Sequence, residues 1–323
     1  MTNVLVLGGT GWLSGRIARG WLERGADVTC LARGGREAPV GARLLVDDRA
    51  TADAYIGAAH TDWDEVIDVS SHPAHVGEAV RALAPRAAHW TYVSSVSVYA
   101  ANDSAGDDES APLAVPAEDG DTSDYSRAKA ACEAVVAGLG ERAAIVRPGL
   151  IVGPGDPTDR FGYWPARFAR EGDQPVLAPD GEGLFAQVID VDDLAGFVVD
   201  AGARRWHGVV NAVGQSVPLD EMLEAIRRVA DHSGPVERVP ASWLSEQGVA
   251  PWAGSRSLPL WLPADLPGFA TRSGDAYVRA GGRIRPIDET IARVLDDERA
   301  RGVERPREAG LSVDEERALL ARR

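Results

Sequence analysis

The sequence predicts an α/β protein in which a doubly wound parallel sheet is joined to a smaller, interleaved carboxyl-terminal domain. Residues 4–7 form a continuous apolar run, as expected of a buried parallel strand, and a glycine-rich turn and an amphipathic helix follow. Further apolar runs alternate with helical patterns, an order that predicts helices on both faces of a parallel sheet. A chain of 323 residues is long enough for one large domain or two interlocked ones.

The acidic composition restricts the partners of the protein. Asp and Glu number 49 against 34 for Lys and Arg, and this formal net charge of −15 argues against a nucleic-acid partner. Cys30 and Cys132 are too few for a disulfide framework or a zinc site. No apolar run has membrane-spanning length, and the chain opens without the charged region of a secretion signal. We therefore expect a cytoplasmic protein with a small-molecule substrate and no membrane partner.

The first turn has the context of a dinucleotide-binding site. Gly8 and Gly11 lie between the strand at 4–7 and a helix that Gly25 stops. Glycines in this position let the backbone approach a pyrophosphate at the helix N-terminus, as in a Rossmann domain. Ser14 takes the place of the third glycine, and a serine is small enough for the helix to pack closely on the strand.

The end of the second strand, residues 27–32, indicates which dinucleotide is bound. An NAD site has an acidic residue there for the ribose 2′-hydroxyl, whereas this chain has Arg33 and Arg36 on a glycine loop. Because arginine binds phosphate in a bidentate fork, we expect NADP, with NAD as the alternative. The other interpretation is that both arginines are solvated turn residues.

Polar residues also end the next strands. Asp48 follows a third strand at 43–46, where a carboxylate can accept a hydrogen bond from the adenine amino group. A fourth strand at 65–69 and a fifth at 90–93 follow, and Ser95 comes just after the fifth. Ligands of such sheets lie at the carboxyl ends of the strands, so these residues are expected near one site.

His72 and His75 lie before and at the start of a helix around 76–83. The pair could in principle bind a metal ion, but the sequence offers no third ligand. We interpret both as loop and helix-start residues, and we expect no metal site.

Residues 102–124 form an acidic loop with eight Asp and Glu residues and no Lys or Arg. Its composition predicts a solvated, mobile segment. It could cover the site as a flap, because it joins the fifth strand to the next helix, or it could be an inert surface loop.

Tyr125 and Lys129 begin a predicted helix at 125–139, for which Ser123 is the expected N-cap. Residues four apart lie on one face of a helix, and an ammonium group near a phenol favours the phenolate and lowers the phenol pKa. Such a pair could exchange a proton with a substrate hydroxyl or carbonyl. The pentapeptide alone would also suit a plain surface helix.

Together, these motifs resemble the extended short-chain dehydrogenase/reductase family, which includes NAD-dependent epimerases and dehydratases. The pieces occur in the order and at the spacings of the family, over roughly the first 200 residues. They are GGTG at 8–11, YVSSVSVY at 92–99, YSRAK at 125–129, VRPG at 146–149 and VIDVDDLA at 188–195.

The resemblance implies a role for each matching residue. Tyr125 would be the catalytic acid/base, Lys129 would lower its pKa and bind the nicotinamide ribose, and Ser95 would hydrogen-bond the reacting oxygen. The remaining cofactor contacts would come from the glycine turn, the adenine end and the groove: Gly8, Thr10, Gly11, Trp12, Leu13, Asp48, Arg49, Ser70 and Pro148.

The chain also departs from the family pattern. Val96 and Ser97 occupy the place of the Asp-Glu pair of nucleotide-sugar dehydratases, so an elimination that needs those carboxylates is not expected. Gly149 and Leu150 follow Pro148 where many sugar epimerases have an Asn or aromatic residue, which makes a nucleotide-sugar substrate less expected.

The carboxyl-terminal half contains fewer recognisable patterns. We expect a dinucleotide-binding domain at 1–152, to which 183–213 returns, and a substrate domain at 153–182 and 214–323. Residues 258–263 are apolar and broken by proline, and we expect them in the core. They could instead wall a hydrophobic substrate pocket or form a subunit contact.

The leading hypothesis is therefore an NADP-dependent oxidoreductase that moves hydride between nicotinamide and the carbonyl or alcohol carbon of a small metabolite, as a monomer or homodimer. An epimerase of a sugar or nucleotide sugar, which keeps its NAD(P), could use the same residues. A non-catalytic NADP-binding sensor or scaffold is the third alternative, and the presence of Ser95, Tyr125 and Lys129 argues against it.

Overall fold

The chain passes repeatedly between two units in the computed structural model, which describes residues 2–118 and 120–323. The first unit contains Met1–Gly149, Val191–Val213 and Arg272–Arg283, and the second contains Leu150–Asp190, Gly214–Thr271 and Ile284–Arg323. Each unit is assembled from three separate stretches of the chain, and their bounds differ from the expected ones at two places. Residues 183–190 lie in the second unit, and Arg272–Arg283 makes a further return to the first unit that the sequence did not indicate.

The first unit is built on a parallel sheet of seven described strands in the order β10-β6-β5-β4-β1-β2-β3. The chain moves outward from β1 in one direction and then in the other, which is the doubly wound topology that was predicted. The strands are β1 (Asn3–Leu7), β2 (Asp27–Ala32), β3 (Arg43–Val46), β4 (Glu65–Asp68), β5 (Trp90–Val93), β6 (Ala143–Pro148) and β10 (Gly208–Ala212).

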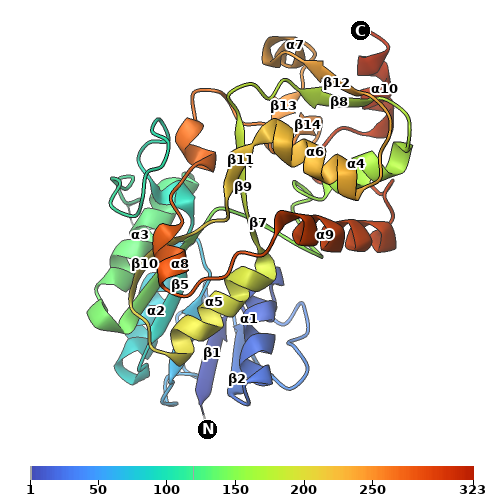
Figure 1. Ribbon diagram of the computed structural model, residues 1–323. Coiled ribbons are helices and arrows are strands. Elements are labelled where there is room, and N and C mark those ends of the chain that lie inside the picture. The colour runs from blue at the N-terminus through green and yellow to red at the C-terminus, as the bar shows by residue number, and fades with distance from the viewer. Residues whose placement is uncertain (1, 119) are drawn as a thin grey trace. The chain divides into compact units, whose positions relative to one another are not determined.

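Helices cover both faces of this sheet, as Figure 1 shows. The helices α1 and α5 pack together on one face, and α2 and α3 pack together on the other, while the short α8 lies against the edge strand β10. Their bounds are α1 (Trp12–Glu23), α2 (Pro73–Leu83), α3 (Tyr125–Ala137), α5 (Val191–Ala203) and α8 (Asp275–Arg279), with 3₁₀ turns η1 (Ala84–Arg86), η2 (Val96–Val98) and η3 (Gly140–Arg142).

The central strands form because both of their faces are buried. All four residues of β4 and of β5 are buried, and so are the last four of β1, so the sequence there is a nearly unbroken apolar run. Parallel pairing in register brings Leu7 beside Leu31 of β2 and Asp68 of β4, at the carboxyl edge of the sheet. The exceptions in β4 are two buried carboxylates, Glu65 at the start of the strand and Asp68 at its end.

The second unit combines small sheets with a helical cluster. A three-stranded sheet has the order β11-β9-β7, and two pairs, β12-β8 and β13-β14, lie beside it in the described chain. The helices α4, α6 and α9 pack against one another. The elements are β7 (Leu150–Val152), β8 (Val176–Pro179), β9 (Phe185–Asp190), β11 (Ser216–Pro218), β12 (Val236–Val239), β13 (Ala250–Pro251), β14 (Ser257–Leu258), α4 (Tyr163–Glu171), α6 (Leu219–Val229), α7 (Ala241–Glu246), η4 (Pro267–Ala270), α9 (Ile287–Arg301) and α10 (Val313–Leu320).

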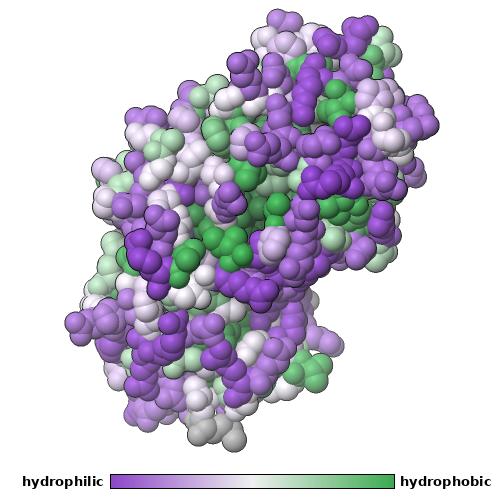
Figure 2. Space-filling model, viewed as in Figure 1, coloured by the Kyte–Doolittle hydropathy of each residue, from purple (hydrophilic) through white to green (hydrophobic). Residues whose placement is uncertain are grey.

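The proline-broken segment at 258–263 belongs to the core of the second unit. Leu258, Leu260 and Trp261 are buried in one hydrophobic cluster with Trp164 and Phe168 of α4. The expectation that this segment is core is therefore confirmed. Polar and charged residues cover most of the visible surface (Figure 2), and no helix among the described residues is long and apolar enough to cross a membrane.

Candidate functional site

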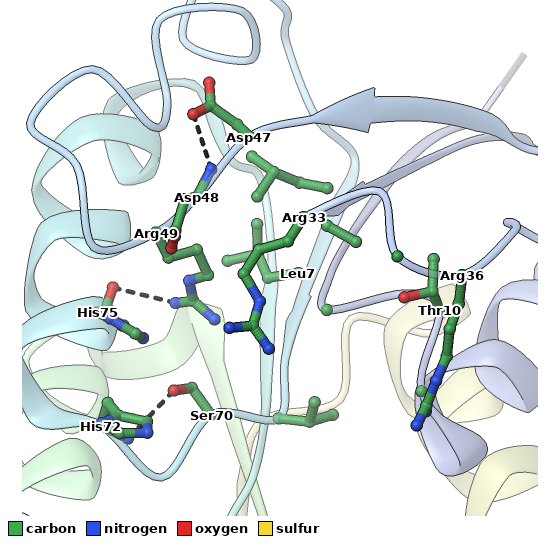
Figure 3. A pocket seen from close by; sticks show the side chains of 16 residues that line it. Leu7, Thr10, Arg33, Arg36, Asp47, Asp48, Arg49, Ser70, His72 and His75 are labelled. Carbon is green, nitrogen blue, oxygen red and sulfur yellow. Dashed lines mark hydrogen bonds between the residues drawn. The ribbon is translucent and has the colours of Figure 1, made fainter.

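A cavity of about 760 Å³ opens at the carboxyl ends of β1, β2, β3 and β4, within the first unit. Figure 3 shows its walls: the glycine turn and the two arginines after β2 on one side, and the start of α2 on the other. The lining residues that the sequence predicted for the cofactor are Gly8, Thr10, Gly11, Arg33, Arg36, Asp48, Arg49 and Ser70. The structure therefore brings together residues from four strand ends, as a doubly wound sheet requires.

The glycine turn is closed by Ser14. Gly8 has a φ of 78°, which a side chain would strain, and a Cβ on Gly11 would come within 2.8 Å of the Ser14 hydroxyl. That hydroxyl donates to the Gly8 carbonyl at 2.6 Å and accepts from the Gly11 amide at 3.2 Å. The serine thus does more than substitute for a small residue, because it fixes the turn before α1. Trp12 and Leu13 form the first turn of α1.

Arg33 and Arg36 have different positions in the cavity. Figure 3 shows the Arg33 side chain reaching into the space in front of Arg49, whereas Arg36 lies beside Thr10 at the glycine turn. Both side chains are exposed at the cavity rim. Arg33 is the residue directly after β2, and of the two arginines it lies nearer Asp48.

Arg49 lines the cavity, and its guanidinium is hydrogen-bonded to other residues of the chain. Its guanidinium donates two hydrogen bonds to the Asp68 carboxylate, at 2.8 and 2.6 Å, one to the Tyr55 hydroxyl at 2.8 Å and one to the His75 carbonyl at 3.0 Å. Burial lowers the pKa of Arg49, but the Asp68 carboxylate more than offsets this and raises it overall. Arg49 therefore forms a fixed wall of the site, while Asp48 stays exposed beside it.

His72 and His75 complete the wall opposite Arg33. His72 is the N-cap residue of α2, His75 lies in its first turn, and their ring centroids are 4.8 Å apart. Burial lowers the pKa of His75, and the neighbouring Arg49 guanidinium lowers it further. Their places confirm the expected loop and helix-start positions. The absence of a metal site stays a prediction, although no cluster of three potential ligands occurs among the described residues.

Lys129 is the only lysine in the sequence, and it is 3% exposed. Its ammonium group donates to the Ser70 carbonyl at 3.0 Å and to the Val93 carbonyl at 2.8 Å, and it lies 4.8 Å from the centre of the Tyr92 ring. Burial lowers the pKa of Lys129 from its ordinary 10.5 to about 8. The lysine thus bridges the carboxyl ends of β4 and β5, directly behind the cavity-lining Ser70.

Tyr125 is the first residue of α3, and half of its side-chain surface is exposed. The N-cap of this helix is Asp124, whose carboxylate accepts from the Arg127 amide at 3.1 Å, and not the expected Ser123. Asp124 is preferred because its carboxylate, one residue closer to the first turn, reaches that amide. The phenol therefore projects from a capped, rigid helix end.

Ser95 lies between β5 and η2, at the predicted strand end. Its hydroxyl accepts from the Ser97 amide at 3.1 Å and donates to the Ser97 hydroxyl at 3.1 Å, so it caps η2. The Ser126 hydroxyl, next to Tyr125, donates to the Ser97 carbonyl. This bond ties the serine turn to the start of α3, although Ser95, Tyr125 and Lys129 do not line the large cavity. Pro148 is buried at the end of β6.

Two residues of this region escaped the sequence analysis. Asp68 holds Arg49, and Tyr92 donates through its hydroxyl to the Ser70 carbonyl at 2.8 Å. An Asp that ends a buried strand at the edge where ligands bind is a signal that could have revealed the first. The partner of Tyr92 lies 22 residues away and on another strand end, so no local pattern marks it.

The cavity fits the adenosine and pyrophosphate portion of NAD or NADP. Its volume lies in the range of small-molecule sites, and its floor is a backbone turn in which a Cβ on Gly11 would crowd Ser14. The amino end of α1 is a favourable place for phosphate, and Arg33 adds a cation at the end of β2. The cavity-lining Ser70 is hydrogen-bonded through its carbonyl to Lys129.

Comparisons with known proteins agree with this geometry. The sequence matches the model of the NAD dependent epimerase/dehydratase family over residues 4–211, and no curated protein matches it significantly. A solved candidate epimerase from Burkholderia cenocepacia J2315 is 21% identical, with 93% of this chain and 98% of that one covered and a TM-score of 0.72.

Two further solved structures are similar over nearly the whole chain. A nucleoside-diphosphate-sugar epimerase from Pseudomonas aeruginosa is 17% identical, with 94% and 99% covered and a TM-score of 0.68. The UDP-Glc/GlcNAc 4-epimerase from Campylobacter jejuni is 13% identical, with 93% and 100% covered and a TM-score of 0.68. Identities this low show a shared fold and leave the reaction to be argued from the site.

Proposed function

Because the chain belongs to the NAD dependent epimerase/dehydratase family and is therefore an enzyme, we propose that it is an NADP-dependent oxidoreductase. It transfers hydride between the nicotinamide and the carbonyl or alcohol carbon of a small metabolite. The first unit, which contains the cavity, binds the dinucleotide. This proposal is more specific than the family, whose members include epimerases and dehydratases.

The observation that carries the choice of cofactor is the position of Arg33. Its guanidinium reaches into the cavity at the end of β2, where an NAD site holds an acidic residue. A guanidinium favours the 2′-phosphate of NADP, because it can donate two parallel hydrogen bonds to the phosphate oxygens. An exchangeable NADPH suits net reduction better than a tightly held cofactor that returns its hydride.

In the proposed reaction, the protein positions groups and moves one proton. When bound, the nicotinamide supplies or accepts the hydride. Tyr125 donates a proton to the substrate oxygen during reduction, or accepts one during oxidation, and Ser95 donates a hydrogen bond to the same oxygen. Lys129 has three N–H groups, of which two are held by the Ser70 and Val93 carbonyls. We assign the third to the nicotinamide ribose, and the positive charge favours the phenolate of Tyr125.

An epimerase is the second candidate, since the family includes epimerases. In this case the bound nicotinamide would take the hydride and return it to the other face of the rotated keto intermediate, while Tyr125 would remove and return the hydroxyl proton, with Lys129 and Ser95 in the same roles. Val96 and Ser97 stand where family dehydratases carry two carboxylates, so elimination is not proposed. The two candidates differ in cofactor balance, because a reductase consumes NADPH stoichiometrically and an epimerase does not.

The acid/base role is tested by Tyr125→Phe. The variant is expected to bind NADPH as the wild type does, because the change removes one exposed hydroxyl at a helix end. With a carbonyl substrate found by a panel of small ketones and aldehydes, NADPH oxidation should fall by about 10²-fold or more, the usual contribution of a general acid. Normal turnover by the variant would refute the role of Tyr125.

The cofactor preference is tested by Arg33→Ala, with Arg36→Ala as the matched control. Loss of the Arg33 fork is expected to weaken NADPH binding by roughly 10- to 100-fold, with little change for NADH, as followed by nicotinamide fluorescence. The control should lose less, since Arg36 lies at the glycine turn. Equal losses for NADPH and NADH in Arg33→Ala would remove the argument for NADP.

A further inference from the structure

Asp68 is the only charged residue that has no exposed surface at the carboxyl edge of β4, among the residues that the structure describes there. One of its carboxylate oxygens accepts from Arg49 at 2.8 Å and from the Ser70 amide at 2.9 Å. The other accepts from Arg49 at 2.6 Å. The carboxylate is therefore saturated by one guanidinium from the cavity wall and one backbone amide from the strand end.

Asp68 and Lys129 are hydrogen-bonded to the same residue, Ser70. The Ser70 carbonyl accepts from the Lys129 ammonium at 3.0 Å and from the Tyr92 hydroxyl at 2.8 Å. Hydrogen bonds thus connect five groups in one continuous network: Arg49, the Asp68 carboxylate, the Ser70 backbone, Lys129 and Tyr92. Its first member lines the cavity that fits adenosine, and Lys129 lies outside that cavity.

We propose that Asp68 is a positioning residue that couples the adenosine end of the cofactor site to Lys129. It fixes the Ser70 carbonyl, and this carbonyl sets where the ammonium lies. A ligand that contacts Arg49 shifts the same hydrogen-bonded groups from the cavity side. The inference rests on the role proposed above for Lys129, but it concerns how the lysine is held and can be tested without a substrate.

The alternative is that Asp68 merely neutralises a buried arginine. Leaving Arg49 without its partner would then cost stability, and loss of the Asp68 charge would lower the Lys129 pKa, but the hydrogen bonds of the ammonium and the exchange of its protons would stay unchanged. The surroundings of the ammonium limit the other causes of a change. The groups that act on it are Asp68 from β4, Tyr92 from β5, and Cys132 and Glu133 from α3, while Arg49 acts on Asp68.

The sequence offers an unusually direct probe, because Lys129 is its only lysine. Protein labelled with ¹⁵N at the lysine ζ position gives one NMR signal, which reports both the titration of the ammonium and the exchange of its protons. The wild type is expected to titrate near pH 8. Two carbonyl acceptors should slow the exchange of its protons.

The decisive variant is Asp68→Asn, with Tyr55→Phe as the matched control that removes one bond to Arg49 but leaves Asp68 and Ser70 joined. Asp68→Asn should lower the Lys129 titration midpoint by roughly 0.5–1 pH unit and speed proton exchange several-fold. The control should leave both unchanged. Because loss of the Asp68 charge lowers the midpoint by itself, the exchange rate decides: unaltered proton exchange of Lys129 in folded Asp68→Asn would overturn the proposal.

If Asp68→Asn does not fold, Arg49→Lys carries the same test. A lysine would keep a positive charge beside Asp68 but lose the bidentate fork, so a smaller change in the same direction is expected. This variant would add a second ζ signal, which is identified by comparison with the wild-type spectrum. No change in the Lys129 signal would again overturn the proposal.

A ligand experiment tests the coupling in the unmodified protein. Adenosine 2′,5′-bisphosphate carries the adenosine and 2′-phosphate groups but has no nicotinamide ribose, so it does not reach Lys129. Saturation with it should shift the Lys129 signal in the wild type and not in Asp68→Asn, and adenosine 5′-monophosphate tests whether the 2′-phosphate is needed. A saturated protein with an unshifted signal would refute the coupling, whereas the proposed function would fall only with the Tyr125→Phe result.

Discussion

Two buried cations, Lys129 on α3 and Arg147 on β6, have opposite environments. Lys129 is 3% exposed and Arg147 is 4% exposed, and α3 contacts both, since it carries Lys129 itself and Glu133, which binds Arg147. The Lys129 ammonium meets backbone carbonyls of Ser70 and Val93. The Arg147 guanidinium donates to the charged Glu133 carboxylate, at 3.0 and 2.7 Å, and to the Tyr99 hydroxyl, at 2.9 Å.

The difference in partner gives the two cations different chemistry. Burial lowers the pKa of Lys129 to about 8, with partial compensation from nearby acidic groups. Burial also lowers the pKa of Arg147, but the hydrogen-bonded Glu133 carboxylate more than offsets it and raises the pKa overall. One cation loses its proton more readily than a lysine in water, and the other is a permanent charge within the core. Equal burial therefore does not imply an equal role.

The largest effect that tests this comparison is expected from Arg147→Ala. The change leaves the buried Glu133 carboxylate without its partner, and breaking a buried pair in this way costs about 3–5 kcal/mol. Urea unfolding measures the loss. Arg24→Ala is the control, because its pair with Asp200 is exposed and should be worth less than about 1 kcal/mol. A small loss for Arg147→Ala would mean that its pair is no more structural than a surface pair.

The next effect is a pH dependence that belongs to Lys129. Its folded-state pKa lies below the unfolded value of 10.5, so the folded state releases its proton first as pH rises through about 8. The wild type should therefore gain stability between about pH 8 and 10.5 relative to Lys129→Met, by up to about 3 kcal/mol, and lose this gain as pH falls. Urea unfolding of both proteins across this range gives the difference. A constant difference would show that the ammonium is not destabilised by burial.

The smallest effect is expected from Tyr99→Phe. The Tyr99 hydroxyl accepts from Arg147 and donates to the Asn211 side chain at 2.6 Å, so its removal leaves two buried polar partners incompletely bonded. A loss of about 1–2 kcal/mol is expected, since the Glu133 fork and the ring remain. Denaturant midpoints measure it. A loss as large as that of Arg147→Ala would place the stabilisation in the tyrosine and not in the ion pair.

Local patterns predicted the strands of the first unit closely. The ranges 27–32, 43–46 and 90–93 match β2, β3 and β5 as the structure has them, because strands inside a covered parallel sheet leave continuous apolar runs. The N-cap of α3 was misplaced by one residue, since Ser123 and Asp124 are both good capping residues and only the geometry selects Asp124. The return of Arg272–Arg283 to the first unit has no local pattern.

The sequence indicated which residues lie at the site, but it did not indicate their hydrogen-bond partners. Gly8, Arg33 and Ser70 could be placed at one edge because strand ends in a parallel sheet coincide. Arg49 lines the cavity, and its contact with the cofactor stays a prediction; its guanidinium also donates to Asp68, Tyr55 and the His75 carbonyl. Those partners come from three separate segments, so no spacing in the sequence could have shown that they meet.

The sequence by itself determined the parallel sheet, the glycine turn at its edge and the single lysine one helical turn after a tyrosine, because periodicity and local sterics act within a few residues. Only the tertiary structure decided what each polar group binds. The destination of a buried charge depends on which distant group is close enough to replace its lost water. Arg49 is therefore bound to Asp68 in the cavity wall, Arg147 to Glu133 in the core, and Lys129 to two backbone carbonyls.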